Sequence, residues 1–138
     1  MSSDAAPPKL LLPQAPAVVA GVRQAAWLSP EGEIETLSLK EAAGRLRSGA
    51  RPIVCHAKAQ ARRLGEASFP ALDILELFAF VRPARFVLPT PKGVAAALGL
   101  ALPGTLEREA ESLLAAAGVL LAELSERAGG LGDATAAP

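Results

Sequence analysis

The sequence has no tyrosine, one cysteine, one histidine and few aromatic side chains. Aromatic residues make up only 4% of the chain, whereas 51% of the residues are hydrophobic, many of them Ala and Leu. This composition favours helices packed through small side chains over an all-β core. It also excludes disorder for most of the chain, and 138 residues are enough for one domain with a buried core.

A single cysteine cannot form an internal disulfide, which is typical of a protein kept in a reducing cytoplasm. The N-terminus lacks the charged segment and apolar run of a signal peptide. Charged residues or prolines interrupt every apolar stretch before it reaches the roughly 18 residues of a membrane span. We therefore expect a soluble, cytoplasmic protein that has no membrane partner.

The scarcity of cysteine and histidine argues against metal or thiol chemistry. A zinc site needs three or four ligands at set spacings, and Cys55 and His56 have no second Cys or His to help them. Adjacent residues on a strand also point to opposite faces, so these two side chains would not form a nucleophilic pair. We expect Cys55 to be a buried structural residue.

Acidic residues are also too few at any one place for a nuclease centre. Asp73 and Glu76 would share a helix face, but two divalent ions need three or four converging carboxylates. A helix cap is the expected role of Asp73. Neither the phosphate-binding pattern G-x-x-x-x-G-K-[ST] nor G-x-G-x-x-G occurs. The sequence thus predicts no catalytic, cofactor-binding or metal-binding residue in this chain.

The net charge of zero hides an uneven distribution. Residues 45–92 hold nine Lys and Arg against three acids, while residues 1–44 and 105–138 are net acidic. Such an asymmetry is typical of a face that meets phosphate, and equally of an ordinary solvated surface. The candidate nucleic-acid-binding residues are Lys58, Arg62, Arg63, Arg82, Arg85 and Lys92.

Arginine suits phosphate because its planar fork donates two parallel hydrogen bonds. No RNA-binding aromatic motif accompanies these residues, and there is no tyrosine. Any binding would therefore go through the nucleic-acid backbone and would be weak and strongly dependent on salt.

The sequence divides into a flexible N-terminal arm (1–16), a single α/β domain (17–128) and a disordered tail or linker (129–138). Four prolines mark the arm, and Gly129-Gly130 begins the tail. The domain opens with a strand over 17–28, a Ser-Pro-Glu-Gly turn and a strand over 33–37, which together predict a β-hairpin spanning 18–37.

The pattern then predicts alternating helices and short strands. Ser38 and Glu41 form a capping box at the start of the next helix. An interior strand over 52–56 and a helix over 57–64 follow. Residues 68–73 fit either a short strand or the entry to a helix over 74–81, which Pro83 ends.

Residues 85–88 are either a connector or a short strand. A helix begins at Thr90-Pro91 and ends at Gly99, and Thr105 caps the last and longest helix. The prediction is an α/β fold with a small sheet, made of the hairpin plus one or two further strands, and about five helices.

The order of features in residues 51–100 is similar to that of the DEDD-type 3′–5′ exonucleases, which have a ribonuclease-H-like fold. Ile53–His56 matches the strand of that family that ends in histidine. Leu72–Leu77 matches a segment that carries an aspartate into a helix, and Lys92–Leu100 matches a further helix. The resemblance covers about the middle third of the chain.

Three other acidic features of the family have no counterpart here. Its first strand carries Asp-x-Glu, but residues 18–28 contain no acid. Ala57 stands where the family has asparagine, Ala61 lies near the position of its helix aspartate, and its closing His-x-x-x-x-Asp has no histidine. The resemblance therefore implies a degenerate ribonuclease-H-like fold whose metal site is lost.

A second resemblance is carried by residues 71–100, ALDILELFAFVRPARFVLPTPKGVAAALGL. This run resembles the N-terminal region of bacterial DinG-type ATP-dependent DNA helicases, in which a degenerate exonuclease-like domain precedes the motor. The resemblance implies DNA and helicase motor domains, in cis or in trans, as partners. ATP and Mg would be cofactors of that motor, an ATP hydrolase, and not of this chain.

The expectation is a non-catalytic accessory domain that positions nucleic acid or docks on the motor. Two alternatives stay open, an active exonuclease and a protein-interaction domain without a nucleic-acid role.

Overall fold

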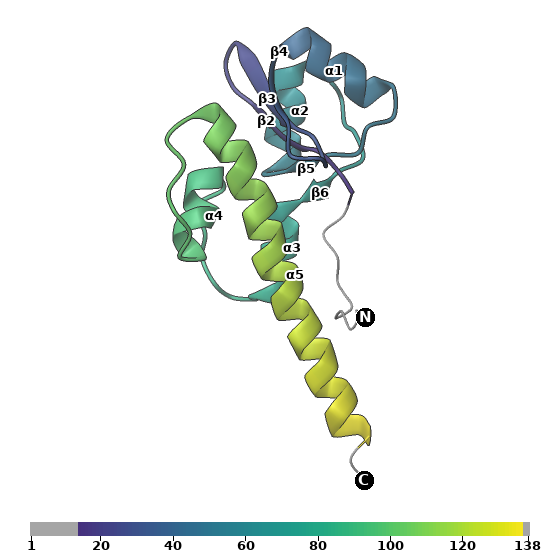
Figure 1. The fold of residues 1–138 in the computed structure, drawn as a ribbon, viewed down its shortest axis with the longest axis vertical. Coiled ribbons are helices and arrows are strands. Elements are labelled where there is room, and N and C mark those ends of the chain that lie inside the picture. Colours follow the sequence, from purple (N-terminus) through teal and green to yellow (C-terminus); the bar gives the residue numbers. More distant parts are fainter. Residues whose placement is uncertain (1–13, 137–138) are drawn as a thin grey trace.

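A computed structural model describes the backbone of residues 14–136 and the side chains of residues 14–128 (Figure 1). The predicted N-terminal arm thus lies outside the described residues except for 14–16. The strands are β2 (Ala17–Ala20), β3 (Gln24–Leu28), β4 (Ile34–Ser38), β5 (Ile53–Val54) and β6 (Leu72–Asp73). The helices are α1 (Leu39–Arg47), α2 (Ala57–Leu64), α3 (Ile74–Val81), α4 (Pro91–Ala97) and α5 (Leu106–Ala136).

The strands form one mixed sheet in the order β4-β3-β2-β5-β6. β2, β3 and β4 are antiparallel neighbours, whereas β5 joins β2 in parallel and β6 joins β5 in parallel. The α/β class predicted from the sequence is confirmed. The parallel half is short, because β5 and β6 have only two residues each.

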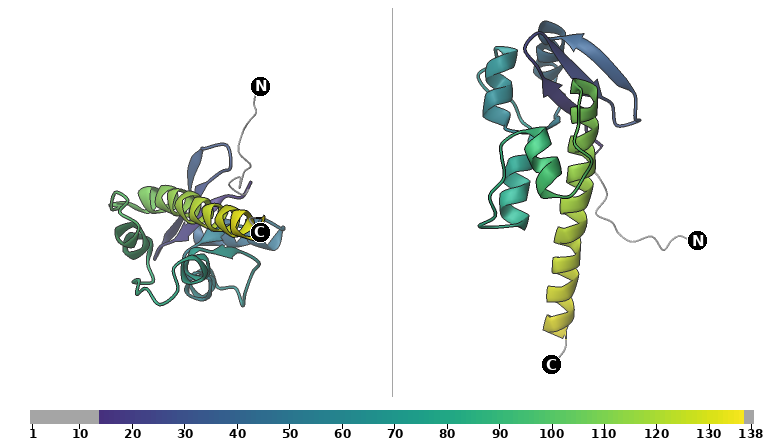
Figure 2. Two further views of the ribbon diagram at one scale, coloured as in Figure 1. Left: turned by 90° about the horizontal axis from the view of Figure 1, so that it is seen from below. Right: turned by 90° about the vertical axis from the view of Figure 1, so that its left-hand side faces the viewer.

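Helices cover both faces of the sheet (Figures 1 and 2). Side chains of β2 alternate between two cores, with Val19 in the core shared with α3 and α5 and Val18 in the core shared with α1 and α2. A strand that is buried on both faces must be apolar throughout. This explains the sequence Ala-Val-Val-Ala of the central strand.

The prediction of one strand over residues 17–28 is wrong. The segment is a hairpin of β2 and β3, in which the Gly21 N–H donates to the Gln24 carbonyl at 2.8 Å. Val22 lies at the tip with 85% of its surface exposed. The predicted hairpin is therefore the second half of a three-stranded meander, and its predicted turn is confirmed by the bond from the Gly32 N–H to the Ser29 carbonyl.

Most helix boundaries follow the predicted capping chemistry. The Ser38 hydroxyl accepts the Glu41 N–H at 3.0 Å, and the Glu41 carboxylate accepts the Ser38 N–H at 3.2 Å, so the capping box is confirmed. Thr90 likewise caps α4. Of the two alternatives for residues 68–73, the structure shows a short strand, β6, at Leu72–Asp73. Residues 85–88 form a connector.

Helix α5 packs on the sheet through buried side chains such as Leu113 and Leu120 and projects beyond the rest of the fold (Figure 1). Its backbone stays helical through residues 129–136, where the sequence predicts a disordered tail or linker. Among the helices of residues 14–136, none is long and apolar enough to cross a lipid bilayer.

Asp73 joins the parallel strands to the helices that follow them. Its Oδ1 accepts the N–H of His56 at 2.9 Å and that of Leu75 at 3.0 Å, while Oδ2 accepts the N–H of Ala57 at 2.8 Å. The side chain is buried, with 9% of the residue exposed. The capping role predicted for Asp73 is confirmed, and it extends to two helices, α2 and α3.

Replacing Asp73 with alanine should destabilise the fold strongly. The change leaves backbone N–H groups without partners at the starts of two helices, and we expect the free energy of unfolding to fall by about 3 kcal/mol. Urea denaturation measures the effect. Glu76→Ala, an exposed acid one turn later on α3, is the matched control and should cost less than about 1 kcal/mol. Equal losses in the two variants would contradict the account.

Candidate functional site

The candidate site lies where the three parallel strands end. In open α/β sheets, ligands bind in the crevice outside the carboxyl ends of the strands. Here β2 ends at Ala20, β5 is followed by Cys55 and His56, and β6 ends at Asp73. The first residues of α5 reach the same edge, because a Cβ on Gly21 would lie 3.3 Å from the Leu106 side chain.

Two side chains of α2 close the end of the central strand. The Gln60 Oε1 accepts the Ala20 N–H at 2.6 Å, and the Arg63 Nη1 donates to the Ala20 carbonyl at 2.7 Å. Gln60 is buried, with 7% exposed. Sequence analysis missed Gln60, because a polar residue in a short helix gives no sign of a backbone partner 40 residues away.

Glu109 of α5 brings two of the predicted cations together. Burial raises the pKa of the Glu109 carboxyl above its usual value, and the nearby charges of Lys92 and Arg63 act in the opposite direction. A residue from each of α2, α4 and α5 therefore contributes to one charged cluster. Sequence analysis does not group these residues, since they come from three separate elements.

His56 is a structural cap. Its backbone adopts the left-handed conformation, with a φ of 69°, and its Nδ1 accepts the Ala59 N–H at 3.0 Å at the start of α2. A nitrogen that accepts a hydrogen bond cannot carry a proton at the same time. The Nδ1 atom of His56 is thus engaged by the backbone of α2.

Cys55 is buried, as predicted, with 4% exposed. Desolvation raises the pKa of its thiol to about 12, and the negative charges of Asp73 and Glu109 act in the same direction. The thiolate is the reactive form of cysteine. The Cys55 thiol is therefore almost entirely protonated at neutral pH.

Acids do not converge at this edge of the sheet. Within the part of the chain that the structure describes, no group of three or more His, Cys, Asp or Glu side chains is placed to hold a metal ion. The Asp73 carboxylate accepts three backbone N–H groups, and Glu76 is exposed on α3.

The six predicted basic residues fall into two groups. The first, which we name the strand-end group, consists of the three cations of α2 (Lys58, Arg62 and Arg63) and of Lys92 of α4, whose charge acts on Glu109 together with that of Arg63. Lys58 and Arg62 are exposed and lie four residues apart on α2, so they share one face of the helix.

The second group, which we name the connector group, consists of Arg82, Arg85 and Arg127. The charges of all three arginines lower the pKa of the Glu123 carboxyl. Arg82 donates hydrogen bonds to this carboxylate from Nε at 3.1 Å and from Nη2 at 3.0 Å. Glu109 and Glu123 are 14 residues apart on α5, so the two groups are separated by about 21 Å along the helix. Sequence analysis missed Arg127, which lies in a last helix that has more acids than cations.

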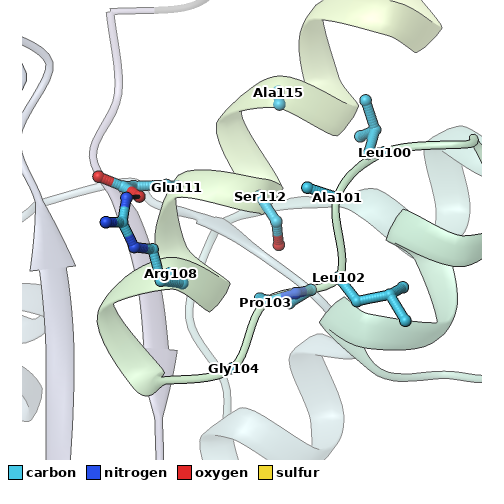
Figure 3. Close-up of a pocket in the computed structure, with 9 residues that line it drawn as sticks. All are labelled: Leu100, Ala101, Leu102, Pro103, Gly104, Arg108, Glu111, Ser112 and Ala115. Atoms are coloured by element: carbon cyan, nitrogen blue, oxygen red, sulfur yellow. Dashed lines mark hydrogen bonds and ion pairs between the residues drawn. The ribbon is translucent and has the colours of Figure 1, made fainter.

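Two cavities bear on the choice of site. One of about 420 Å³ adjoins the strand-end group and is lined by residues including Lys58, Asp73 and Glu76. A larger one of about 600 Å³ lies between the α4–α5 connector and the first turns of α5 (Figure 3). Its charged residues, Arg108 and Glu111, bind each other at 2.8 Å, so it offers no free polar group of that pair to a ligand.

Comparisons of the chain with protein families, with curated proteins and with solved structures find no match.

Replacing Arg63 with alanine should destabilise the fold much more than replacing Arg62. Arg63→Ala removes a charged hydrogen bond to the central strand, and we expect it to lower the free energy of unfolding by about 1.5 to 3 kcal/mol. Arg62→Ala removes an exposed side chain and should change it by less than about 0.5 kcal/mol. Urea denaturation compares the two variants. A larger loss of stability in Arg62→Ala than in Arg63→Ala would contradict the prediction.

The Cys55 thiol should be protected from alkylation in the folded state. A pKa near 12 leaves far less thiolate at pH 8 than an ordinary cysteine has, because the pKa is raised from 9.0. We expect iodoacetamide labelling, followed by mass spectrometry, to be slower by at least about 100-fold in buffer than in denaturing urea. Similar rates under both conditions would show that Cys55 is accessible and ionised.

Proposed function

We propose that this chain is a non-catalytic module with a degenerate ribonuclease-H-like fold, which serves as the N-terminal accessory domain of a DinG-type ATP-dependent DNA helicase. In this role it holds nucleic acid through phosphate contacts at the strand-end group. The observation that carries the proposal is the end of the central strand, where Gln60 and Arg63 bind the Ala20 backbone.

The arrangement of the sheet supports the proposed fold. A ribonuclease-H-like sheet likewise continues an antiparallel meander with parallel strands, as β2, β5 and β6 do here. The three segments that resemble the exonucleases also fall on matching elements. Val54 ends a strand before His56, Asp73 leads into α3, and Lys92 lies in α4.

The charges at the strand end support the absence of nuclease chemistry. A two-metal nuclease neutralises two divalent ions about 4 Å apart with several carboxylates. Here a guanidinium, Arg63, lies at the end of the central strand, and Lys92 is close to the same acid, Glu109. Fixed cations repel a divalent ion at this place and attract a phosphate.

Exposure supports a role of the same edge in binding phosphate. Lys58, Arg62 and Lys92 are exposed, while Arg63 is held at the strand end. The four cations of the strand-end group outnumber the three carboxylates near them, those of Asp73, Glu76 and Glu109, so this place is net positive. In this proposal ATP and Mg belong to the motor of the helicase, and docking on that motor is the second part of the role.

Binding of a fluorescein-labelled single-stranded oligonucleotide, followed by fluorescence anisotropy between about 50 and 200 mM salt, tests the proposal. The parent chain should bind more weakly as salt rises. Lys58→Ala/Arg62→Ala should weaken binding about tenfold at low salt and make the slope of log K against log salt shallower by about 1.4, or 0.7 for each lost contact.

Arg51→Ala is the matched control, because Arg51 is exposed and precedes β5 at the opposite edge of the sheet. The DNA affinity and the salt slope of Arg51→Ala should equal those of the parent chain. If the parent chain does not bind DNA at about 50 mM salt, the nucleic-acid role is wrong and the alternative of a protein-interaction domain is left.

A further inference from the structure

The connector between α3 and α4, residues 82–90, lies beside two exposed aromatic rings. The chain has only four phenylalanines. Phe80, near the end of α3, has 68% of its surface exposed, and Phe86 in the connector has 83%. Two of the four phenylalanines are thus exposed to solvent within residues 80–86, although the chain has few aromatic residues.

The backbone that presents Phe86 is firmly held. Ala84 adopts the left-handed conformation with a φ of 67°, which is uncommon for a residue that carries a Cβ. The next side chain after Phe86, Val87, packs against the core. Leu88 lies directly against α4, since a Cβ on Gly93 would come within 2.5 Å of the Leu88 carbonyl oxygen. The ring of Phe86 therefore projects from a fixed turn.

Positive charge surrounds the same segment. Arg82 and Arg127 bind at the end of α3, where Arg127 donates to the Val81 carbonyl and Arg82 holds Glu123. The hydrogen bond from Arg82 lowers the pKa of the Glu123 carboxyl, and the charges of Arg127 and Arg85 lower it further. Three arginines stand against this one carboxylate, so the connector group has a net charge of about +2 at neutral pH.

We propose that the connector group, together with Phe80 and Phe86, is a binding site for single-stranded nucleic acid. Unpaired bases stack on the two phenylalanine rings, and Arg85 pairs with a neighbouring phosphate. The inference rests on the proposed nucleic-acid role, and it adds a second place of contact, about 21 Å from the strand-end group along α5.

The combination of groups favours this ligand over a duplex or a protein. Every base has a flat face that an exposed ring can stack on, and stacking contributes about 1–3 kcal/mol per base. A duplex hides these faces inside its own stack. A purely apolar protein partner would leave the excess of arginine without counter-charge, whereas the phosphates of a single strand supply it.

The test uses a labelled oligo(dT) strand and the full chain, with fluorescence anisotropy at one low salt concentration and in a salt series. Phe80→Ala/Phe86→Ala should weaken binding by at least about 5-fold and leave the salt slope unchanged, because stacking releases no counterions. Phe86→Trp should restore most of the affinity lost in Phe86→Ala. Arg85→Ala should instead make the slope shallower by about 0.7.

Leu102→Ala is the matched control, since Leu102 is 60% exposed in the other connector, between α4 and α5, where the nearby Arg108 is paired with Glu111. It should bind as the parent does. Urea midpoints should be equal for all of these variants, because the replaced side chains are exposed.

Three results would overturn the inference. If Phe80→Ala/Phe86→Ala binds oligo(dT) as well as the parent while Lys58→Ala/Arg62→Ala binds weakly, this site is wrong and the proposed function stands. If the phenylalanine variant loses affinity for a duplex as much as for oligo(dT), the rings do not stack on unpaired bases. A parent chain that binds no strand at all would overturn both proposals.

Discussion

A single buried carboxylate, that of Asp73, holds the parallel half of this fold together. The strands β5 and β6 have two residues each, too few for their own ladder hydrogen bonds to fix the helices that follow them. The three backbone N–H groups that Asp73 accepts come from His56, Ala57 and Leu75, so one side chain aligns the starts of α2 and α3. The positions of Gln60 and Arg63 depend on that alignment, because both lie on α2.

The capping role of Asp73 limits which ligands can bind at the ends of the parallel strands. A carboxylate that accepts three N–H groups has little capacity left for a metal ion. The neighbouring groups also disfavour a metal ion, since burial keeps the Cys55 thiol protonated and Arg63 occupies the end of the central strand. The edge of the sheet that binds ligands in many α/β proteins is thus built from caps and cations.

Local chemistry predicted much of the fold. The capping box at Ser38, the cap at Thr90 and the bounds of α3 follow from residues close in sequence, and the structure agrees with them. The strand over 17–28 was mispredicted because the apolar pattern continues through Gly21, whose turn is defined by a bond to Gln24. The site itself was only partly predictable. Nothing local reveals that Arg63 and Gln60 bind a strand 40 or more residues earlier, or that Arg127 joins Arg82 and Arg85 around Glu123.

We propose that the ends of the parallel strands attract phosphate and do not hold the pair of metal ions that strand cleavage requires. Titration of the ¹⁵N-labelled chain with Mn²⁺ tests it most directly, because a bound paramagnetic ion broadens the amide signals around it. The account predicts no saturable broadening at the amides of Gly21, Ala57 and Glu109. Saturable loss of these signals at about two ions per chain would mean that the site holds a metal pair after all.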